Sequence, residues 1–154
     1  MPNLFPVFST PPPLEAVQQK QRENLFKPSV YFDFERGDFT KDGLNRVRES
    51  SGYEAWKQWC IKAIYTERYA HSAYSSNIGV ELEKAFAAHD RDTAAAIIQQ
   101  TITDAIMFDP IRRTQAVGDF TFNWQEDHVQ VSCTITSVNG DKADIAVALT
   151  RGGV

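Results

Sequence analysis

Three successive segments near the end of the chain, in which apolar and polar residues alternate, constrain the fold more than any other feature. Alternation with a period of two is typical of β-strands that bury one face, because successive side chains of a strand point to opposite sides. The apolar members of the three segments are Phe120, Phe122 and Trp124; Val129, Val131, Cys133 and Ile135; and Ala143, Ile145, Val147 and Leu149. The pattern therefore predicts three successive strands, each with one buried face.

The parity of the last connecting loop predicts how the second and third of these strands pair. The dipeptide Asn139-Gly140 suits a two-residue turn, but such a turn would place the apolar Ile135 opposite Asp144. A three-residue loop over 138–140, with its glycine in the left-handed conformation, pairs Ile135 with Ala143 instead. We therefore predict the three-residue loop.

A stretch from Tyr53 to Phe86 precedes these strands and opens as an amphipathic helix. Ser51 and Glu54 have the spacing of a capping box, in which each side chain accepts the backbone proton of the other residue. The apolar stripe that follows at helical spacing is Trp56, Trp59, Cys60, Ala63 and Ile64. We expect a core helix, then a loop in which Gly79 supplies a positive φ, and then a second short helix from Val80 to about Ala88.

A third helix is predicted to begin at Asp90 or Asp92, either of which can serve as its cap. Its apolar positions repeat over four turns: Ala94, Ile97, Ile98, Thr101, Ile102, Ala105 and Ile106. It should end by Asp109, because Pro110 disfavours the helical conformation in the residue before it.

An N-terminal hairpin is predicted before the first helix. Val30, Phe32 and Phe34 alternate with Asp33 and Glu35, as in a half-buried strand. Arg36-Gly37 suits a two-residue turn that places Phe39 opposite Phe34. Asp42-Gly43 marks a further turn. The order of hairpin, three helices and meander predicts a small α+β domain. Its antiparallel sheet, formed by the N-terminal hairpin and the C-terminal meander, packs on about three helices.

The chain divides into an N-terminal arm, residues 1–28, and an α+β domain, residues 29–154. The arm holds six of the seven prolines and a polar run at 18–24 that cannot bury much surface alone. Large apolar residues are nevertheless scattered through it: Leu4, Phe5, Val7, Phe8, Leu25 and Phe26. Two alternatives remain open, a solvated tail and an arm that becomes ordered against a neighbouring subunit.

Charge and composition argue against several classes of function. The net charge is −4 and the basic residues are scattered, which argues against nucleic acid as a main partner. No apolar run approaches the about 18–20 residues of a membrane-spanning helix, and no secretory signal opens the chain, so we expect a soluble protein made in the cytoplasm. Three histidines lie in different elements, so we expect no metal and no cofactor. Cys60 and Cys133 are expected to be buried reduced thiols.

Glu67 and Arg68 form the one constellation that resembles a catalytic site. The residues near them are Tyr69, His71, Tyr74 and Glu81. A carboxylate at the end of an aromatic helix could be the general acid of a glycosidase, but that chemistry needs a second carboxylate across a cleft. The alternative is that Glu67 and Arg68 satisfy backbone groups of the loop or pair across an interface. We assign no catalytic residue and expect no enzymatic activity.

The same residues carry a resemblance to a known family. The matching pieces are Phe32-Asp33-Phe34, Gly37-Asp38-Phe39, Gly52-Tyr53-Glu54-Ala55-Trp56, Thr66-Glu67-Arg68-Tyr69, Tyr74-Ser75, Gly79, Glu81-Leu82-Glu83, Asp109-Pro110-Ile111-Arg112 and Phe120-Thr121-Phe122. Over about residues 30–150 the chain resembles the small baseplate wedge protein of contractile-tailed phages, also called the sheath initiator and long described as lysozyme-like. Many members carry a proline between the glutamate and the arginine. Here the two are adjacent, as in the branch found in phage-like elements of bacterial genomes.

The resemblance implies a structural part of a tail baseplate in the virion, assembled in the host cytoplasm. The implied partners are other baseplate wedge subunits, the tail sheath protein, and tail tube or hub proteins, without nucleic acid or membrane. Two alternatives stay open: a peptidoglycan-degrading tail lysozyme and a tail assembly chaperone absent from the particle. The residues selected for structural or interaction roles are Glu67, Arg68, Tyr69, Tyr74, Gly79, Ile145, Val147 and Leu149.

The last predicted strand is expected to be an assembly edge. Residues 145–149 are five apolar residues in a row, so both faces of the strand are apolar and something should cover the outer one. An internal helix or the N-terminal arm is one explanation. The other is β-augmentation, in which a strand of a sheath or wedge subunit joins this edge. The resemblance favours the second explanation.

Overall fold

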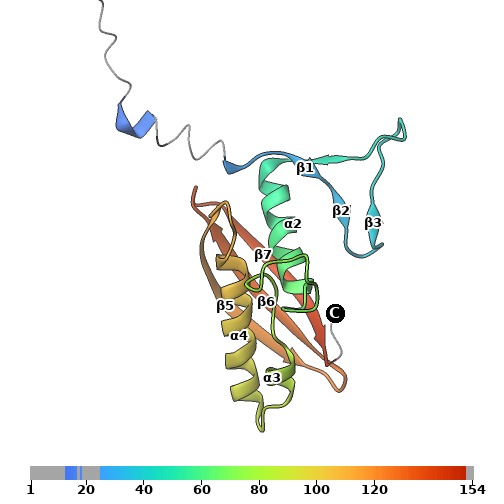
Figure 1. Ribbon diagram of the computed structural model, residues 1–154, viewed down its shortest axis with the longest axis vertical. Helices are drawn as coiled ribbons and strands as arrows, with labels where there is room; N and C mark the ends of the chain where they lie inside the picture. Colours follow the sequence, from blue (N-terminus) through green and yellow to red (C-terminus); the bar gives the residue numbers. More distant parts are fainter. Residues whose placement is uncertain (1–12, 17, 19–24, 152–154) are drawn as a thin grey trace, which may run out of the picture.

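The computed structural model describes residues 13–16, 18 and 25–151, and the α+β class is confirmed (Figure 1). Its helices over 25–151 are α2 (Gly52–Tyr65), α3 (Glu83–Phe86) and α4 (Arg91–Met107). Its strands are β1 (Ser29–Val30), β2 (Phe32–Asp33), β3 (Asp38–Phe39), β4 (Glu49–Ser50), β5 (Thr114–Trp124), β6 (His128–Ser137) and β7 (Lys142–Thr150). Most of the predicted arm, residues 1–28, lies outside the described residues.

The three long C-terminal strands form one antiparallel sheet in the order β5-β6-β7, and the helices cover one of its faces (Figure 1). Every second residue of β6 and β7 is buried, as the alternation predicted. These residues share a single core with Trp56 and Ile64 of α2 and with Ile98 and Ile102 of α4. The outward-facing residues of β7 are exposed.

The predicted pairing of β6 with β7 is confirmed. Ile135 lies opposite Ala143, and the loop between the strands occupies 138–140. Gly140 has a φ of +90°, and its backbone N–H donates to the Ser137 carbonyl at 3.0 Å. The register is therefore set by the burial of one face of each strand, and the tighter two-residue turn does not form.

The predicted capping box of α2 is also confirmed. The Glu54 backbone N–H donates to the Ser51 hydroxyl at 3.2 Å, and the Ser51 N–H donates to the Glu54 carboxylate at 3.1 Å. In α4 the cap is Asp90, whose carboxylate accepts the backbone N–H of Thr93 at 2.7 Å. Local side-chain hydrogen bonds thus begin both long helices.

The predicted second helix begins later than expected. Helix α3 starts at Glu83 rather than at Val80, because the backbone of Val80 is already paired elsewhere. The Val80 N–H donates to the Thr66 carbonyl at 2.9 Å, and the Val80 carbonyl accepts the N–H of Arg68 at 2.9 Å. Glu67 and Val80 thereby form a short parallel bridge that the local sequence pattern does not reveal.

The predicted register of the N-terminal hairpin is wrong. Phe39 lies opposite Phe32, not Phe34, so the turn spans residues 34–37. The Asp33 carboxylate stabilises this longer turn by accepting the backbone N–H groups of Glu35 at 3.0 Å and Arg36 at 3.2 Å. The short strands around it form two separate two-stranded sheets, β1-β4 and β2-β3.

A buried ion pair lies between α4 and β5. The Arg113 guanidinium binds the Asp109 carboxylate through Nε at 2.8 Å and Nη2 at 3.2 Å, and the two side chains are 7% and 1% exposed. Asp109 also accepts the backbone N–H groups of Ile111 and Arg113. Its oxygens therefore have several donors, as a buried charge requires.

Candidate functional site

The loop from Glu67 to Gly79 is the first of two candidate interaction surfaces. It leaves the C-terminal end of α2 and returns at the Glu67–Val80 bridge. Arg68, which is half-buried, donates from Nε to the Gly79 carbonyl at 3.1 Å and so joins the two ends of the loop. Gly79 has a φ of +98°, and a Cβ at this position would meet the Thr66 carbonyl oxygen at 2.5 Å. Only glycine fits this crossing without displacing backbone.

Glu67 differs from its neighbour because its side chain is exposed. Within residues 25–151 no ion pair or hydrogen bond reaches its carboxylate, although Arg68 is adjacent in the chain. Of the two residues, Arg68 therefore bonds a backbone group of the loop, and the Glu67 carboxylate does not. An exposed carboxylate also lacks the apolar enclosure that the general acid of a glycosidase needs.

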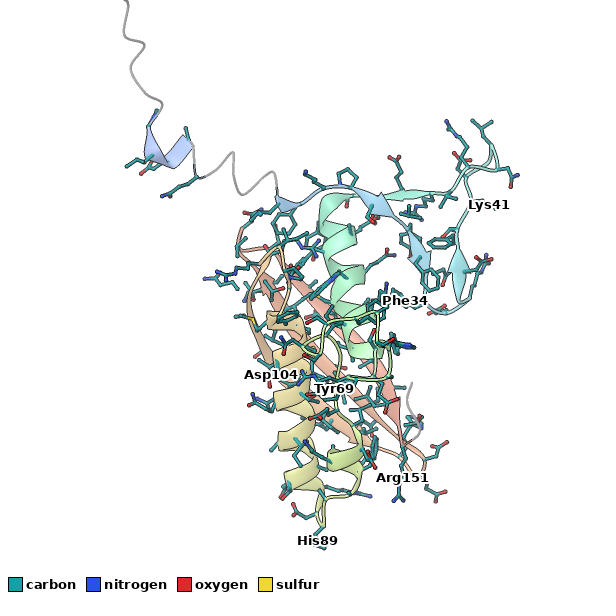
Figure 2. The ribbon with its side chains drawn as sticks, in the orientation of Figure 1. Phe34, Lys41, Tyr69, His89, Asp104 and Arg151 are labelled. Carbon is teal, nitrogen blue, oxygen red and sulfur yellow. The ribbon has the colours of Figure 1, made fainter. Side chains whose placement is uncertain are left out.

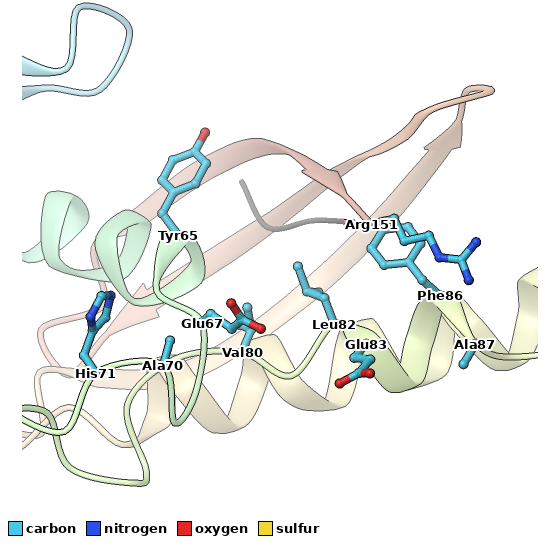
Figure 3. A pocket seen from close by; sticks show the side chains of 10 residues that line it. All are labelled: Tyr65, Glu67, Ala70, His71, Val80, Leu82, Glu83, Phe86, Ala87 and Arg151. Carbon is cyan, nitrogen blue, oxygen red and sulfur yellow. The ribbon is translucent and has the colours of Figure 1, made fainter.

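Glu67 borders two hollows. The larger one has a volume of 630 Å³ and contains His71 near one end, Arg151 at the other, and Glu67 and Glu83 between them (Figure 3). The second, of 390 Å³, is bordered by Arg68, Tyr69, Glu81 and Lys84. Charges of both signs in open hollows suit the polar side chains of a protein partner.

Two exposed aromatic side chains belong to the same loop: Tyr69 borders the smaller hollow, and Tyr74 contacts His71 of the larger one. Tyr69 is 67% exposed and has a φ of +69°, which is rare for a bulky residue (Figure 2). Tyr74 is 44% exposed, packs edge-on against His71 at 5.6 Å, and lies 5.7 Å from the Lys62 ammonium. Tyrosine and arginine are enriched among the residues that dominate binding at protein interfaces. Backbone strain held at an exposed aromatic residue likewise favours a functional role.

Arg151 was not among the residues that sequence analysis selected for this surface. It follows β7 directly and lies far from Glu67 in the sequence, so no local spacing relates the two. The sheet brings it to the larger hollow. It supplies a cation beside the two carboxylates of that hollow.

The edge of β7 is the second candidate surface. The Ser137 backbone N–H donates to the Asp141 carbonyl at 2.8 Å, so this pair is a hydrogen-bonded one. Because such pairs alternate along antiparallel strands, the N–H and C=O groups of Asp144, Ala146 and Ala148 point away from β6. No described backbone or side-chain group pairs with them. At the start of the strand, the outward Lys142 carbonyl accepts the Tyr53 hydroxyl at 2.6 Å.

The side chains of β7 divide between the two faces of the sheet. Ile145, Val147 and Leu149, which sequence analysis selected for this surface, are buried in the core at 2%, 3% and 0% exposure. Ala146 and Ala148 lie on the outer face and are exposed. No described helix covers that face, which leaves the explanation by an internal helix without support. The explanation by the N-terminal arm lies outside the described residues.

Two further classes of site are absent from residues 13–16, 18 and 25–151. No three His, Cys, Asp or Glu side chains come together in an arrangement that would hold a metal ion. No helix in this part of the chain is both long enough and apolar enough to cross a membrane.

Comparisons with known proteins identify related sequences. Residues 29–140 match the family described as contractile injection system sheath initiator. The chain is also similar to the phage-like element PBSX protein XkdS of Bacillus subtilis (strain 168). The two are 34% identical over 110 residues, which cover 70% of this chain and 72% of the relative.

Proposed function

The chain belongs to the contractile injection system sheath initiator family, and on that premise we propose that its β7 edge nucleates the tail sheath. Membership of the family gives the chain a structural role in a contractile phage tail, in association with the sheath. In the finer proposal, a strand of the first sheath subunit pairs with β7 and extends the three-stranded sheet. The observation that carries the proposal is the row of unpaired, outward-facing backbone groups of Asp144, Ala146 and Ala148.

The two edges of the sheet differ in a way that favours β7. Strand β5 is interrupted by irregularities between Thr114 and Ala116 and between Gly118 and Thr121. Asp119, within the second irregularity, has a φ of +52°. Strand β7 keeps an unbroken register over nine pairs, from Lys142 to Thr150. Bulges blunt an edge against pairing, whereas a flat edge is a template for another strand.

The chemistry of β7 fits strand addition. Backbone hydrogen bonds supply affinity in β-augmentation without demanding a particular sequence. The exposed side chains near the edge, Ala146 and Ala148, are small and leave room for an incoming strand. The core side of β7 is fully packed, so an added strand need not disturb the fold.

In the same proposal, the Glu67–Gly79 loop joins the protein to a baseplate wedge subunit. Its support is the combination of exposed Tyr69 and Tyr74 with the charged hollows beside Glu67. The loop and the β7 edge are built from different elements. One protein can therefore hold a wedge subunit and a sheath strand at the same time.

An Ala146→Pro substitution tests strand addition directly. Proline removes the outward N–H of Ala146 but breaks no hydrogen bond to β6, so edge pairing should fail while the isolated domain stays folded. We expect tails with baseplates and tubes but no sheath in electron micrographs. The melting temperature of the purified variant should remain within a few degrees of the wild type.

Ala146→Thr is the matched control, because it changes the same exposed side chain but retains the backbone N–H. Its particles should carry full sheaths. If Ala146→Pro particles also grow full sheaths, or if a map of the assembled baseplate shows the β7 edge bare, the proposal is wrong.

A further inference from the structure

An apolar groove of 380 Å³ lies between the N-terminal hairpin and α2. The N-terminal side contributes Val30, Phe32, Phe34 and Phe39 to its lining. Phe39 is 51% exposed and Val30 is 45% exposed, which are high values for large apolar side chains. Large apolar side chains gathered in one open groove are typical of a binding site, whereas single ones are ordinary surface.

Helix α2 forms the other wall of the groove with one of its faces. Ala55, Gln58, Trp59 and Lys62 line the groove and follow one another at the spacing i, i+3, i+4 and i+7. Residues at this spacing form the ridges by which helices pack against one another. The groove therefore gives a partner access to a face of α2 that is suited to helix packing.

The two walls are held in place by contacts within the protein. The Gln58 side-chain amide donates to the Phe32 carbonyl at 2.8 Å, and the Gln58 side-chain carbonyl accepts the Phe32 N–H at 3.3 Å. Phe34 stacks on Tyr65 of α2 at 5.7 Å (Figure 2). A preformed groove lowers the ordering cost of binding.

The hydrogen bonds to Gln58 also decide which kind of segment the groove accepts. They occupy the backbone N–H and C=O of Phe32, so these groups cannot pair with an incoming strand. A segment that enters an apolar groove has to satisfy its own backbone groups, and an α-helix does so internally. The groove therefore favours a helix over an extended strand.

The one charged side chain in the described lining indicates the charge of the partner. Lys62 is exposed, and within residues 25–151 no carboxylate lies within ion-pair distance of its ammonium. A cation without a partner beside an apolar lining is complementary to a carboxylate on the bound helix.

The described long helices of a second copy of this chain do not fit the groove. Over residues 25–151, the exposed large apolar side chains on these helices are Tyr53, near the start of α2, and Met107, at the end of α4. One such side chain on each helix does not make an apolar stripe. These observations favour a different protein as the partner.

We infer that the groove between the N-terminal hairpin and α2 binds an amphipathic helix of a partner protein. The apolar face of that helix packs on Phe39 and Trp59, and one of its carboxylates pairs with Lys62. The inference does not depend on strand addition at β7 or on the contact of the Glu67–Gly79 loop.

Titration of the full-length ¹⁵N-labelled protein with a synthetic helical peptide tests the inference. The probe is an alanine-based peptide of about five turns, long enough to form a helix in water. It carries leucines at i, i+3, i+4 and i+7 and one glutamate at the end of that stripe. The Trp59 indole signal and the amide signals of Val30 and Phe39 should shift with peptide concentration, and those of β7 should not. If no groove signal shifts up to about millimolar peptide, the inference is wrong.

Two comparison peptides test the helix and the charge separately. Proline in place of a central alanine on the far face breaks the helix but keeps the leucine stripe, and this peptide should bind at least about tenfold more weakly. Lysine in place of the glutamate should weaken binding about threefold to fivefold, as expected for one exposed ion pair. If the broken peptide binds as tightly as the intact helix, the groove accepts an extended segment and a helical partner is wrong.

Variants of the protein provide matched controls. Lys62→Glu should reverse the preference between the glutamate and lysine peptides. Phe39→Asp should weaken the binding of each peptide at least about tenfold, because it places a carboxylate in the apolar lining. Leu44→Asp should leave the affinities unchanged, because Leu44 is 74% exposed but does not line the groove. If Leu44→Asp weakens binding as much as Phe39→Asp, the peptide does not select the groove and the inference is overturned.

The Ala146→Pro variant keeps this test separate from that of strand addition. It should bind the peptides as tightly as the unsubstituted chain does, because Ala146 does not line the groove. Loss of sheath assembly in that variant and loss of peptide binding in Phe39→Asp can therefore be observed independently. If Ala146→Pro also lost peptide binding, the peptide would be binding at the β7 edge and the inference would be wrong.

Discussion

Glu67 and Arg68 are adjacent in the chain but have different physical roles. Arg68 is half-buried and bonds the Gly79 carbonyl, so it holds the loop in shape. The Glu67 carboxylate is exposed, borders two hollows and has no hydrogen-bond or ion-pair partner among the described residues. An unpaired charge at a solvent-exposed position adds little to folding stability but remains free to bind a partner.

Alanine substitutions should separate these two roles. Arg68→Ala should lower the free energy of unfolding by about 1–2 kcal/mol, because the Gly79 carbonyl loses a charged donor. Glu67→Ala should change it by less than about 0.5 kcal/mol, as is usual at exposed positions, yet still impair baseplate assembly. Urea denaturation and electron microscopy of particles measure the two effects. Equal losses of stability would contradict this assignment.

Glu67→Gln separates the structural role from the lysozyme alternative. The substitution keeps the shape of the side chain and should leave most of the fold intact. Purified cell wall is the substrate for the assay, and neither protein should hydrolyse it. If the wild type hydrolyses it and Glu67→Gln does not, the structural role of Glu67 must be abandoned.

The buried Asp109–Arg113 ion pair, unlike the exposed Glu67 carboxylate, should contribute strongly to folding stability. Asp109→Ala should lower the free energy of unfolding by about 3–5 kcal/mol, because it leaves the buried Arg113 guanidinium without its carboxylate. Arg46→Ala is the control, since its pair with Asp42 is exposed, and it should cost less than about 1 kcal/mol. Urea denaturation measures both. If the two variants lost similar amounts of unfolding free energy, burial of the Asp109–Arg113 pair would not explain its contribution to stability.

At the scale of elements, backbone pairing rather than side-chain chemistry defines the candidate surfaces. The Glu67–Gly79 loop is closed by the bridge between Glu67 and Val80 and by the close approach of Gly79 to Thr66. The β7 edge is open because the sheet ends there. Both surfaces therefore depend on where backbone groups find partners.

Two glycines with similar φ angles give a matched test of the loop. Gly79→Ala should destabilise the protein by more than the about 1–2 kcal/mol of a left-handed alanine, because its Cβ would also meet the Thr66 carbonyl. Gly140→Ala has a φ of +90° but open space around its Cβ, so it should cost only the conformational strain. Thermal unfolding compares them. Equal losses would mean that the backbone crossing at Gly79 is not tight.

For the whole molecule, the sheet links the two candidate surfaces. Arg151 follows β7 directly and borders the same hollow as Glu67 (Figure 3). The end of β7, to which the sheath strand is proposed to bind, therefore adjoins the proposed wedge contact. A groove lined by Val30, Phe32, Phe39 and Trp59 lies between the N-terminal hairpin and α2. These surfaces surround one core.

Two cysteines in that core predict how global stability depends on pH. Burial raises the pKa of the Cys60 thiol to about 12 and that of Cys133 to about 11, from an ordinary value of 9.0. Their contribution to stability is therefore complete below about pH 9. It is lost as the pH rises from 9 towards 12, because the unfolded chain ionises first.

A double variant, Cys60→Ala with Cys133→Ala, measures this contribution. Wild-type stability should fall more steeply than that of the variant between about pH 8 and about pH 10.5, where unfolded thiols ionise. Urea denaturation across this range gives the two slopes. Parallel curves would show that the thiols are not the cause.

The sequence by itself determined the features that depend on local physics. The alternation in β6 and β7, the parity of the 138–140 loop and the caps at Ser51 and Asp90 were all predictable, because each follows from residues near one another in the chain. Arg68 and Gly79 were also selected from sequence, through the loop chemistry and a family resemblance. What they bond to was not evident from their spacing.

Tertiary structure decided the features in which distant segments compete for the same backbone groups. Val80 pairs with the end of α2 and so cannot begin a helix, and the stacking of Phe34 on Tyr65 accompanies a four-residue turn rather than the predicted tight one. The exposure of Glu67 and the position of Arg151 at the same hollow likewise follow from how the sheet and loop pack. Such contacts join residues far apart in the chain, and periodicity reports only on near neighbours.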